Sequence, residues 1–193
     1  MRAGGAGRDS SVSDGSTGYD RETVGRFERA VLPHLDAAHN LARWLAGEPA
    51  DAEDVVQEAY LRALRGFGTF HGGDVRCWVL TIVRNTCYTW LRRNRGPQAM
   101  ASLDDEAAGA VESTDPRPDA ALLRHAEAAM VREAIEQLPP EFREAIVLRE
   151  LEGLSYKQIA EVTHLPMGTV MSRLARARQR LQQALADRVS NEA

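Results

Sequence analysis

Hydroxyl and guanidinium side chains recur at helical spacing toward the carboxyl end of this chain. Guanidinium groups bind the acceptor atoms that guanine presents in the major groove, and hydroxyl groups bond to bases or phosphates. The side chains fall on one side of a helix that we predict to begin after Pro166. We therefore expect a contact surface for duplex DNA formed by Thr169, Ser172, Arg173 and Arg176.

A helix-turn-helix over 153–181 would position this surface. Ser155 is a suitable N-cap for a short first helix, and Pro166 breaks the helical pattern at a corner. Placing the second helix in the major groove is how helix-turn-helix proteins read duplex DNA. The alternative is a helical hairpin in an unrelated all-α domain with a solvated arginine face. The buried stripe of the second helix is predicted to consist of Val170, Leu174, Ala177 and Leu181.

Aromatic and basic residues mix along another segment, 75–95, which we predict to be one long helix. Such a mixture suits single-stranded nucleic acid, whose unstacked bases pack on aromatic faces. The alternative is a structural role, in which Trp78 and Trp90 anchor a core and the terminal arginines complement the helix dipole. We expect each interpretation to hold for different residues, with Trp90 in the core. Hydrogen-bond donors and a stacking ring are supplied by Arg84, Asn85, Tyr88 and Arg92.

A further helix, predicted to begin at a cap on Asp51, has an acidic and amide surface around one exposed leucine. A solvated face is the more common explanation of such a pattern, and a partner-binding surface is the other explanation. The surface consists of Asp54, Gln57, Glu58 and Leu61.

The composition indicates a packed protein without catalytic chemistry. Of the 193 residues, 44% are hydrophobic, which is enough for a core. The net charge is −4, although arginines form local clusters. No motif joins a nucleophile to a base, forms a phosphate-binding loop or spaces His, Cys and acids as zinc ligands. We therefore expect no enzyme activity, no metal, no cofactor and no small-molecule substrate.

Cysteine usage and hydropathy both favour a cytoplasmic protein. Cys77 and Cys87 fall in one predicted helix, where their separation of roughly 15 Å excludes a disulfide, so we expect buried free thiols. No apolar run approaches the ~20 residues that cross a bilayer, and the N-terminus lacks the apolar core of a signal peptide. A membrane is therefore not an expected partner.

We predict an all-α protein with two small helical domains joined by a flexible acidic linker. Residues 1–19, rich in glycine and serine, have no apolar period and are expected to be a disordered tail. Helical patterns occupy 20–95 and 122–188, and we expect fraying beyond Leu185. The linker, 96–121, combines prolines with acids and would let the domains lie apart.

Three groups of motifs, together covering roughly 27–95 and 131–181, point to a known family. They are DAEDVVQEAYL at 51–61; CWVL, IVRN and LRR at 77–80, 82–85 and 91–93; and LP, GLS, IA and PMGTVMSR at 138–139, 153–155, 159–160 and 166–173, with Arg143. The last string is the most specific. Through these motifs the chain resembles the extracytoplasmic-function sigma factors of bacterial RNA polymerase, the minimal two-domain group of the sigma-70 family.

The resemblance implies a factor that binds core RNA polymerase and directs promoter-specific transcription initiation, while the polymerase carries the chemistry. The polymerase clamp would be bound through Asp54, Gln57, Glu58 and Leu61. The −10 element would be melted and read through Arg76, Trp78, Arg84, Asn85, Tyr88 and Arg92. The −35 duplex would be read through Thr169, Ser172, Arg173 and Arg176. The expected partners are core RNA polymerase, promoter DNA and an anti-sigma factor.

Three positions depart from the pattern of that family. His164 stands at the helix-turn-helix corner where glycine is common, and left-handed backbone geometry is uncommon at other residues, although histidine is enriched among the exceptions. Thr89 replaces a common aspartate and Met171 a common lysine, so the fold is unaffected while the promoter preference is open.

The competing class is a helix-turn-helix regulator that binds duplex DNA without polymerase. That class explains the C-terminal part of the chain but leaves the segments at 51–61 and 75–95 without a task. An anti-sigma or adaptor protein that makes no DNA contact is a further alternative, and the row of arginines argues against it.

Overall fold

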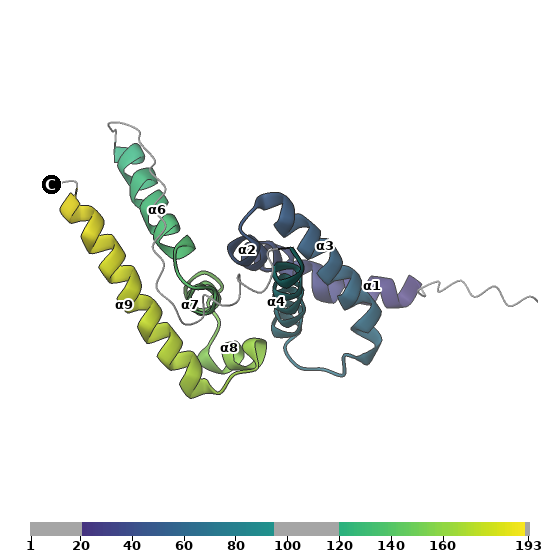
Figure 1. Ribbon diagram of the computed structural model, residues 1–193. Coiled ribbons are helices and arrows are strands. Elements are labelled where there is room, and N and C mark those ends of the chain that lie inside the picture. Colours follow the sequence, from purple (N-terminus) through teal and green to yellow (C-terminus); the bar gives the residue numbers. More distant parts are fainter. Residues whose placement is uncertain (1–20, 95–119, 192–193) are drawn as a thin grey trace, which may run out of the picture.

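The computed structural model describes residues 21–94 and 120–191, and the side chains within 21–94 and 128–188. Every regular element in these ranges is a helix, which confirms the all-α prediction (Figure 1). The predicted tail at 1–19 and nearly all of the predicted linker at 96–121 lie outside the described residues.

The N-terminal half, residues 21–94, packs its helices around an apolar core. Its elements are α1 (Arg21–Val31), the 3-10 turn η1 (Leu32–His34), α2 (Leu35–Ala46), α3 (Pro49–Gly66), the 3-10 turn η2 (Phe67–Thr69) and α4 (Val75–Asn94). Helices α2, α3 and α4 each pack against the other two. Small residues on α2 and α3 let these helices approach closely, and the core includes Ala38, Leu41, Ala42, Val55, Ala59, Leu80 and Val83.

Prolines determine two helix boundaries in this half. Pro33 lies in the turn η1 between α1 and α2. Helix α3 begins at Pro49 with Glu48 as its N-cap, so the predicted cap at Asp51 is wrong. Proline suits the first helical position because its missing N–H would have no partner inside the helix there. Asp51 lies in the first turn instead, where its charge complements the helix dipole.

The C-terminal half, residues 120–191, is built around a long last helix. Its elements are α6 (Ala120–Glu136), α7 (Pro140–Ile146), the π-helical turn η3 (Val147–Leu151), α8 (Tyr156–Thr163) and α9 (Met167–Asn191). Helix α9 packs on α6, α7 and α8. It extends to Asn191, so the predicted fraying beyond Leu185 is wrong. Arg188 of α9 forms an ion pair of 2.6 Å with Glu133 of α6, which holds the end of α9 in place.

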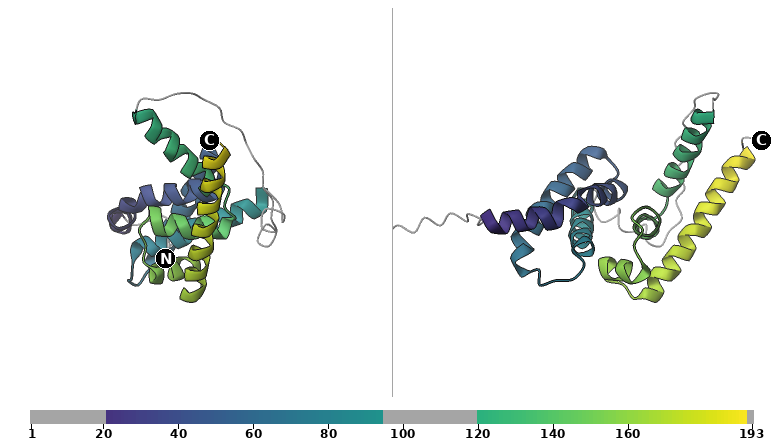
Figure 2. Two further views of the ribbon diagram at one scale, coloured as in Figure 1. Left: turned by 90° about the vertical axis from the view of Figure 1, so that its left-hand side faces the viewer. Right: turned by 180° about the vertical axis from the view of Figure 1, so that it is seen from behind.

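The two halves are in direct contact. Helix α4 packs on α8 and α2 packs on α7, as the right-hand view of Figure 2 shows for α4 and α8. The buried apolar side chains of both halves belong to one continuous cluster. This contact brings part of the aromatic and basic helix α4 against the C-terminal half.

Candidate nucleic-acid and polymerase interface

The helix-turn-helix has a well-formed cap at each end of its first helix, α8. The Ser155 hydroxyl accepts a bond from the Gln158 amide N–H at 3.3 Å, and the Gln158 side chain accepts one from the Ser155 N–H at 2.9 Å. This reciprocal capping box confirms Ser155 as the N-cap. At the other end His164 adopts the left-handed conformation (φ 57°), the geometry for which glycine is favoured, and the chain turns there into α9.

The second helix, α9, turns its predicted apolar stripe inward. Val170, Leu174 and Ala177 are fully buried, as predicted, and Leu181, the fourth residue of the predicted stripe, is partly buried against the core. Of the four residues predicted to contact duplex DNA, Ser172 and Arg176 are exposed and Thr169 is half-buried. Arg173 is also half-buried, because its guanidinium points toward the buried carboxylate of Glu144 with a separation of 4.0 Å. The four residues are thus close in the helix but unequally available to a ligand.

Two methionines enlarge the outward face of α9. Met167 and Met171 are 54% and 51% exposed and lie one helical turn apart at the start of the helix. The predicted contact surface did not include them. The available signal was that neither belongs to the buried stripe, although both are large and apolar.

Aromatic rings gather at the beginning of α4. The Trp78 ring lies 5.0 Å from the Phe70 ring and 6.2 Å from the Phe67 ring, between centroids. Gly72 and Gly73 both have positive φ in the connection between η2 and α4, a conformation that glycine adopts without strain. Trp78 is half-buried, as is Trp90 at the other end of the helix, and both pack on the core.

Arg84 and Tyr88, in the middle of α4, meet the C-terminal half. The Arg84 guanidinium binds both oxygens of Glu144, with Nε at 2.5 Å from Oε1 and Nη2 at 3.3 Å from Oε2. It also stacks on the Tyr88 ring at 4.7 Å. Burial raises the pKa of the Tyr88 hydroxyl, and the nearby Glu144 charge raises it further. Burial also raises the pKa of Glu144, while Arg84 opposes that change.

The beginning of α4 meets the same half through Arg76 and Asp74. Arg76 Nη2 lies 2.7 Å from Glu152 Oε2. The Gln158 side chain donates a bond of 2.8 Å to Asp74, and this bond is the main cause that lowers the pKa of Asp74. Two further residues of the predicted −10 surface, Asn85 and Arg92, remain exposed.

The four residues of the predicted polymerase surface all lie on the outward side of α3. Asp54 and Gln57 are exposed, and Leu61 is 49% exposed between them and the end of the helix. Glu58 forms an ion pair of 2.8 Å with Arg62 on the same helix. The surface thus combines acceptor groups with one large apolar side chain, a combination suited to a protein partner.

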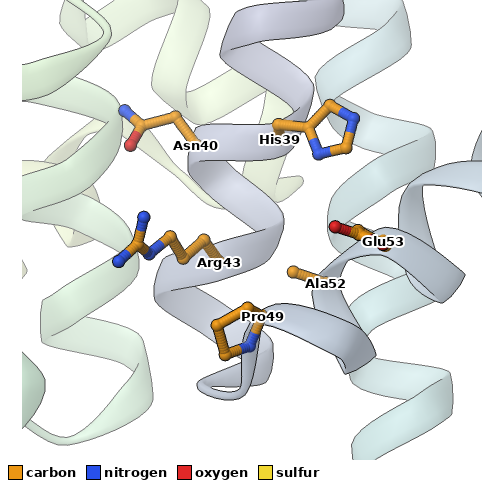
Figure 3. A pocket seen from close by; sticks show the side chains of 6 residues that line it. All are labelled: His39, Asn40, Arg43, Pro49, Ala52 and Glu53. Carbon is orange, nitrogen blue, oxygen red and sulfur yellow. The ribbon is translucent and has the colours of Figure 1, made fainter.

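Helices α2 and α3 line an open pocket of about 340 Å³. It is lined by His39, Asn40, Arg43, Pro49, Ala52 and Glu53. The side chains do not converge on one point, since Asn40 and Arg43 project to one side of α2 and His39 to the other (Figure 3). Within 21–94 and 120–191, no His, Cys, Asp and Glu side chains gather in threes as metal ligands do. The pocket therefore offers no catalytic or metal-binding arrangement.

Cys77 and Cys87 are free thiols, and both are fully buried, as predicted. Burial raises the pKa of Cys87 to about 12. Burial also raises the pKa of Cys77 to about 12, with a further contribution from its hydrogen bond to Asp74. Since the thiolate is the reactive form, neither residue has the environment of a reactive cysteine. Among the helices that the structure describes, none has the length and apolar character needed to cross a membrane.

Comparisons with known proteins account for both halves. The family model for sigma-70 region 2 matches residues 30–96, and the model for sigma-70 region 4 matches residues 128–181. The first match covers the α3 surface and α4, which a helix-turn-helix regulator leaves without a task, so the regulator alternative is not favoured.

Three sigma factors are among the similar proteins. The chain is 36% identical over 166 residues to RNA polymerase sigma-H factor of Pseudomonas aeruginosa, covering 82% of this chain and 86% of that protein. It is 34% identical over 174 residues to the ECF RNA polymerase sigma factor SigE of Mycolicibacterium smegmatis, covering 90% and 67%. It is 38% identical over 136 residues to the ECF RNA polymerase sigma-E factor of Escherichia coli K12, covering 67% and 71%.

Two solved structures resemble the chain across both halves. One is the sigma factor RpoE in complex with the anti-sigma factor NepR from Bartonella quintana, with a TM-score of 0.63, 29% identity and coverage of 83% of this chain and 97% of that one. The other is CnrH in complex with the cytosolic domain of CnrY, with a TM-score of 0.61, 25% identity and coverage of 85% and 90%.

Proposed function

Because the chain belongs to the extracytoplasmic-function group of RNA polymerase sigma factors, we propose that three of its surfaces divide promoter recognition among them. A sigma factor is a transcription initiation factor and not an enzyme, so the chain acts by binding. One surface binds core polymerase, the second engages the −10 element and the third reads the −35 element. The observation that carries the proposal is the match of one chain to both region 2 and region 4.

The polymerase surface is the outward side of α3. Exposed Leu61 is the apolar anchor of this surface. The orientation of the partner is set by the surrounding acceptor groups, which belong to Asp54, Gln57 and Glu58. Buried apolar anchors of this kind supply most of the binding energy in protein interfaces, while the polar rim supplies specificity.

The −10 surface follows α4. Arg84, Tyr88 and the exposed Asn85 and Arg92 offer stacking and donor groups to unpaired bases and to phosphates. Arg76 and the aromatic cluster around Trp78 extend this surface toward the glycine-bearing connection. A side-chain carbon added at Gly72 or Gly73 would meet no atom within 4 Å, and we place at this open connection the site that receives a flipped base.

The −35 surface is the outward face of α9. Ser172 and Arg176 are exposed for contact with the major groove, and Thr169 and Arg173 lie beside them. Losing Arg176 is expected to cost about 1–3 kcal/mol and to relax the preference at one base pair. We place the factor in the cytoplasm, where polymerase and promoters are, and an anti-sigma factor is its expected regulator, by analogy with the complexes of RpoE and CnrH.

Reconstituted transcription tests the function directly. The full chain is mixed with purified core polymerase and a pool of genomic promoter fragments, and initiation from specific sites is the expected result. Leu61→Asp is expected to lower the affinity for core polymerase by about tenfold or more, since a charge replaces the apolar anchor. Leu32→Asp is the matched control, because Leu32 is a similarly exposed leucine (46%) in η1 and is not part of the proposed polymerase surface. Equal loss with both variants, or full binding by Leu61→Asp, would contradict the assignment.

A further inference from the structure

The contact between the halves depends on two buried acids of the C-terminal half. Glu144 of α7 and Glu152, which follows η3, have side chains 1% and 6% exposed. A carboxylate is stable in such surroundings only when cations and donors satisfy it. Each of these acids takes its closest cation from the N-terminal half, Glu144 from Arg84 and Glu152 from Arg76. The acids therefore tie the two halves together.

Two further hydrogen bonds complete the same contact. Asn40 of α2 donates a bond of 2.5 Å to Glu152 Oε1, so Glu152 is held by both α2 and α4. Figure 3 shows Asn40 projecting from α2 on the side away from His39. Arg143 of α7 donates a bond of 3.1 Å to the Trp44 carbonyl of α2. The interface is thus polar and directional as well as apolar, and it selects one arrangement of the halves.

The contact covers part of the surface proposed to engage the −10 element. The Arg84 guanidinium holds Glu144 in a bidentate pair, with Tyr88 stacked against its face. The Arg76 guanidinium holds Glu152. A phosphate or a base edge would compete with Glu144 for Nε and Nη2 of Arg84, and with Glu152 for Nη2 of Arg76. In the closed arrangement the two carboxylates therefore compete with DNA for Arg76 and Arg84.

We propose that the contact between the halves is autoinhibitory: Glu144 and Glu152 occupy the arginines of α4 as acidic substitutes for DNA until the halves separate. This inference rests on the proposed −10 role of α4. When the halves separate and DNA binds, each arginine exchanges a carboxylate partner for a phosphate partner. The guanidinium groups therefore keep an anionic partner in both states. Glu144 keeps Arg173 of its own half as a nearby cation after opening. Binding of one half to polymerase favours the open form only if the closed form obstructs that binding.

Energy transfer between two dyes on the full chain measures the opening. The dyes are attached through Glu28→Cys on α1 and Gln183→Cys on α9, both exposed positions, while the native cysteines are buried. Glu152→Gln removes the charge that holds Arg76, and Asn40→Asp places a second carboxylate against Glu152 from the other half. Both variants are expected to lower the transfer efficiency. A fluorescent single-stranded oligonucleotide of mixed sequence reports access to α4, and its affinity for Glu152→Gln is expected to rise by about three- to tenfold as the open fraction rises.

Glu150→Gln is the matched control. Glu150 is exposed and pairs with Arg178 within the C-terminal half, so this variant loses the same charge without touching the contact. Unchanged transfer efficiency and affinity are expected for it. Transfer efficiency that stays at the native value in both Glu152→Gln and Asn40→Asp would overturn the proposal, as would opening without a gain in oligonucleotide affinity over Glu150→Gln. Failure of the native chain to initiate transcription with core polymerase would instead contradict the proposed function, whatever the dyes report.

Discussion

Met171 is an exposed side chain that we expect to influence the promoter preference of α9. Its side chain is 51% exposed near the beginning of α9, directly before Ser172 in the sequence. An apolar group in the major groove contacts the methyl group of thymine, whereas a charged group binds the acceptors of guanine. The base opposite Met171 is therefore expected to be read by its methyl group.

Met171→Lys is expected to shift the preferred base pair at one −35 position from A·T toward G·C. The lysine ammonium gains acceptors on guanine and loses the methyl contact, a difference of about 1–3 kcal/mol at that position. Selection of −35 sequences from a randomised library with the polymerase-bound factor measures the change. Gln183→Lys, an exposed position farther along α9, is the control for added charge. An identical sequence preference for Met171→Lys and the native chain would refute this role.

The two cysteines illustrate burial that suppresses reactivity. Both thiols are fully buried, and burial raises their pKa values to about 12. We expect neither thiol to react with a disulfide reagent at neutral pH on the time scale of minutes, and both to react after denaturation. Counting modified thiols with and without urea makes the comparison. Rapid modification of the native chain would show that this part of the molecule opens readily.

At the scale of elements, the stability of helix α8 depends on the capping of its two ends, because the helix is short. An isolated helix of this length is unstable in water, so its caps and its packing must hold it. Gly153 adopts a positive φ of 66° just before the cap, and Ser155 and Gln158 then satisfy each other's backbone and side-chain groups. His164 closes the helix in a left-handed conformation. The position of α9 relative to α8 is decided by these local interactions.

Ser155→Ala is expected to lower the free energy of unfolding by about 1 kcal/mol, because one first-turn amide loses its acceptor. Urea unfolding followed by circular dichroism measures the loss. Ser155→Asp keeps an acceptor at the cap and is expected to restore most of the stability. Equal stability of Ser155→Ala and the native chain would mean that the capping box contributes nothing to this fold.

At the scale of the whole molecule, stability is expected to fall at alkaline pH. The folded pKa of Cys87 is raised to about 12 from an ordinary 9.0, so above about pH 9 the unfolded chain releases a proton that the folded chain retains. Stability then decreases as pH rises from about 9 toward 12. From Cys87 alone the free energy of unfolding should drop by about 2 kcal/mol between roughly pH 8 and pH 10.5. Cys77 and Tyr60, whose pKa values are also raised to about 12, act in the same direction.

Urea unfolding at the two pH values, with and without Cys87→Ala, tests this expectation. The substitution removes one of the titrating groups, so the pH dependence should become shallower even if the variant is less stable at every pH. A variant with the same pH dependence as the native chain would show that the pKa of Cys87 does not differ between the folded and unfolded states.

Local patterns in the sequence determined most of the elements and the inward faces of the helices. Helical spacing predicted the buried stripe of α9, and a serine followed after three positions by an amide side chain produced the cap of α8. These features depend on neighbours within one or two helical turns, which the sequence displays directly. The predicted cap at Asp51 is wrong because Pro49, which favours the first helical position, begins the helix two residues before Asp51.

Only the tertiary structure decided which charges pair between the halves. Glu144 lies sixty residues from Arg84 in the chain, and the intervening positions say nothing about whether the two meet. An acid in a helix is usually solvated, so the sequence alone marked neither Glu144 nor Glu152 as buried. Their burial follows from the packing of α2 and α4 on α7 and α8, because that packing removes water from the carboxylates and leaves the arginines of α4 as their cations. The sequence by itself thus indicated, as sets of residues, the surfaces that we propose for DNA and polymerase binding, and the folded chain decided which of these residues are accessible.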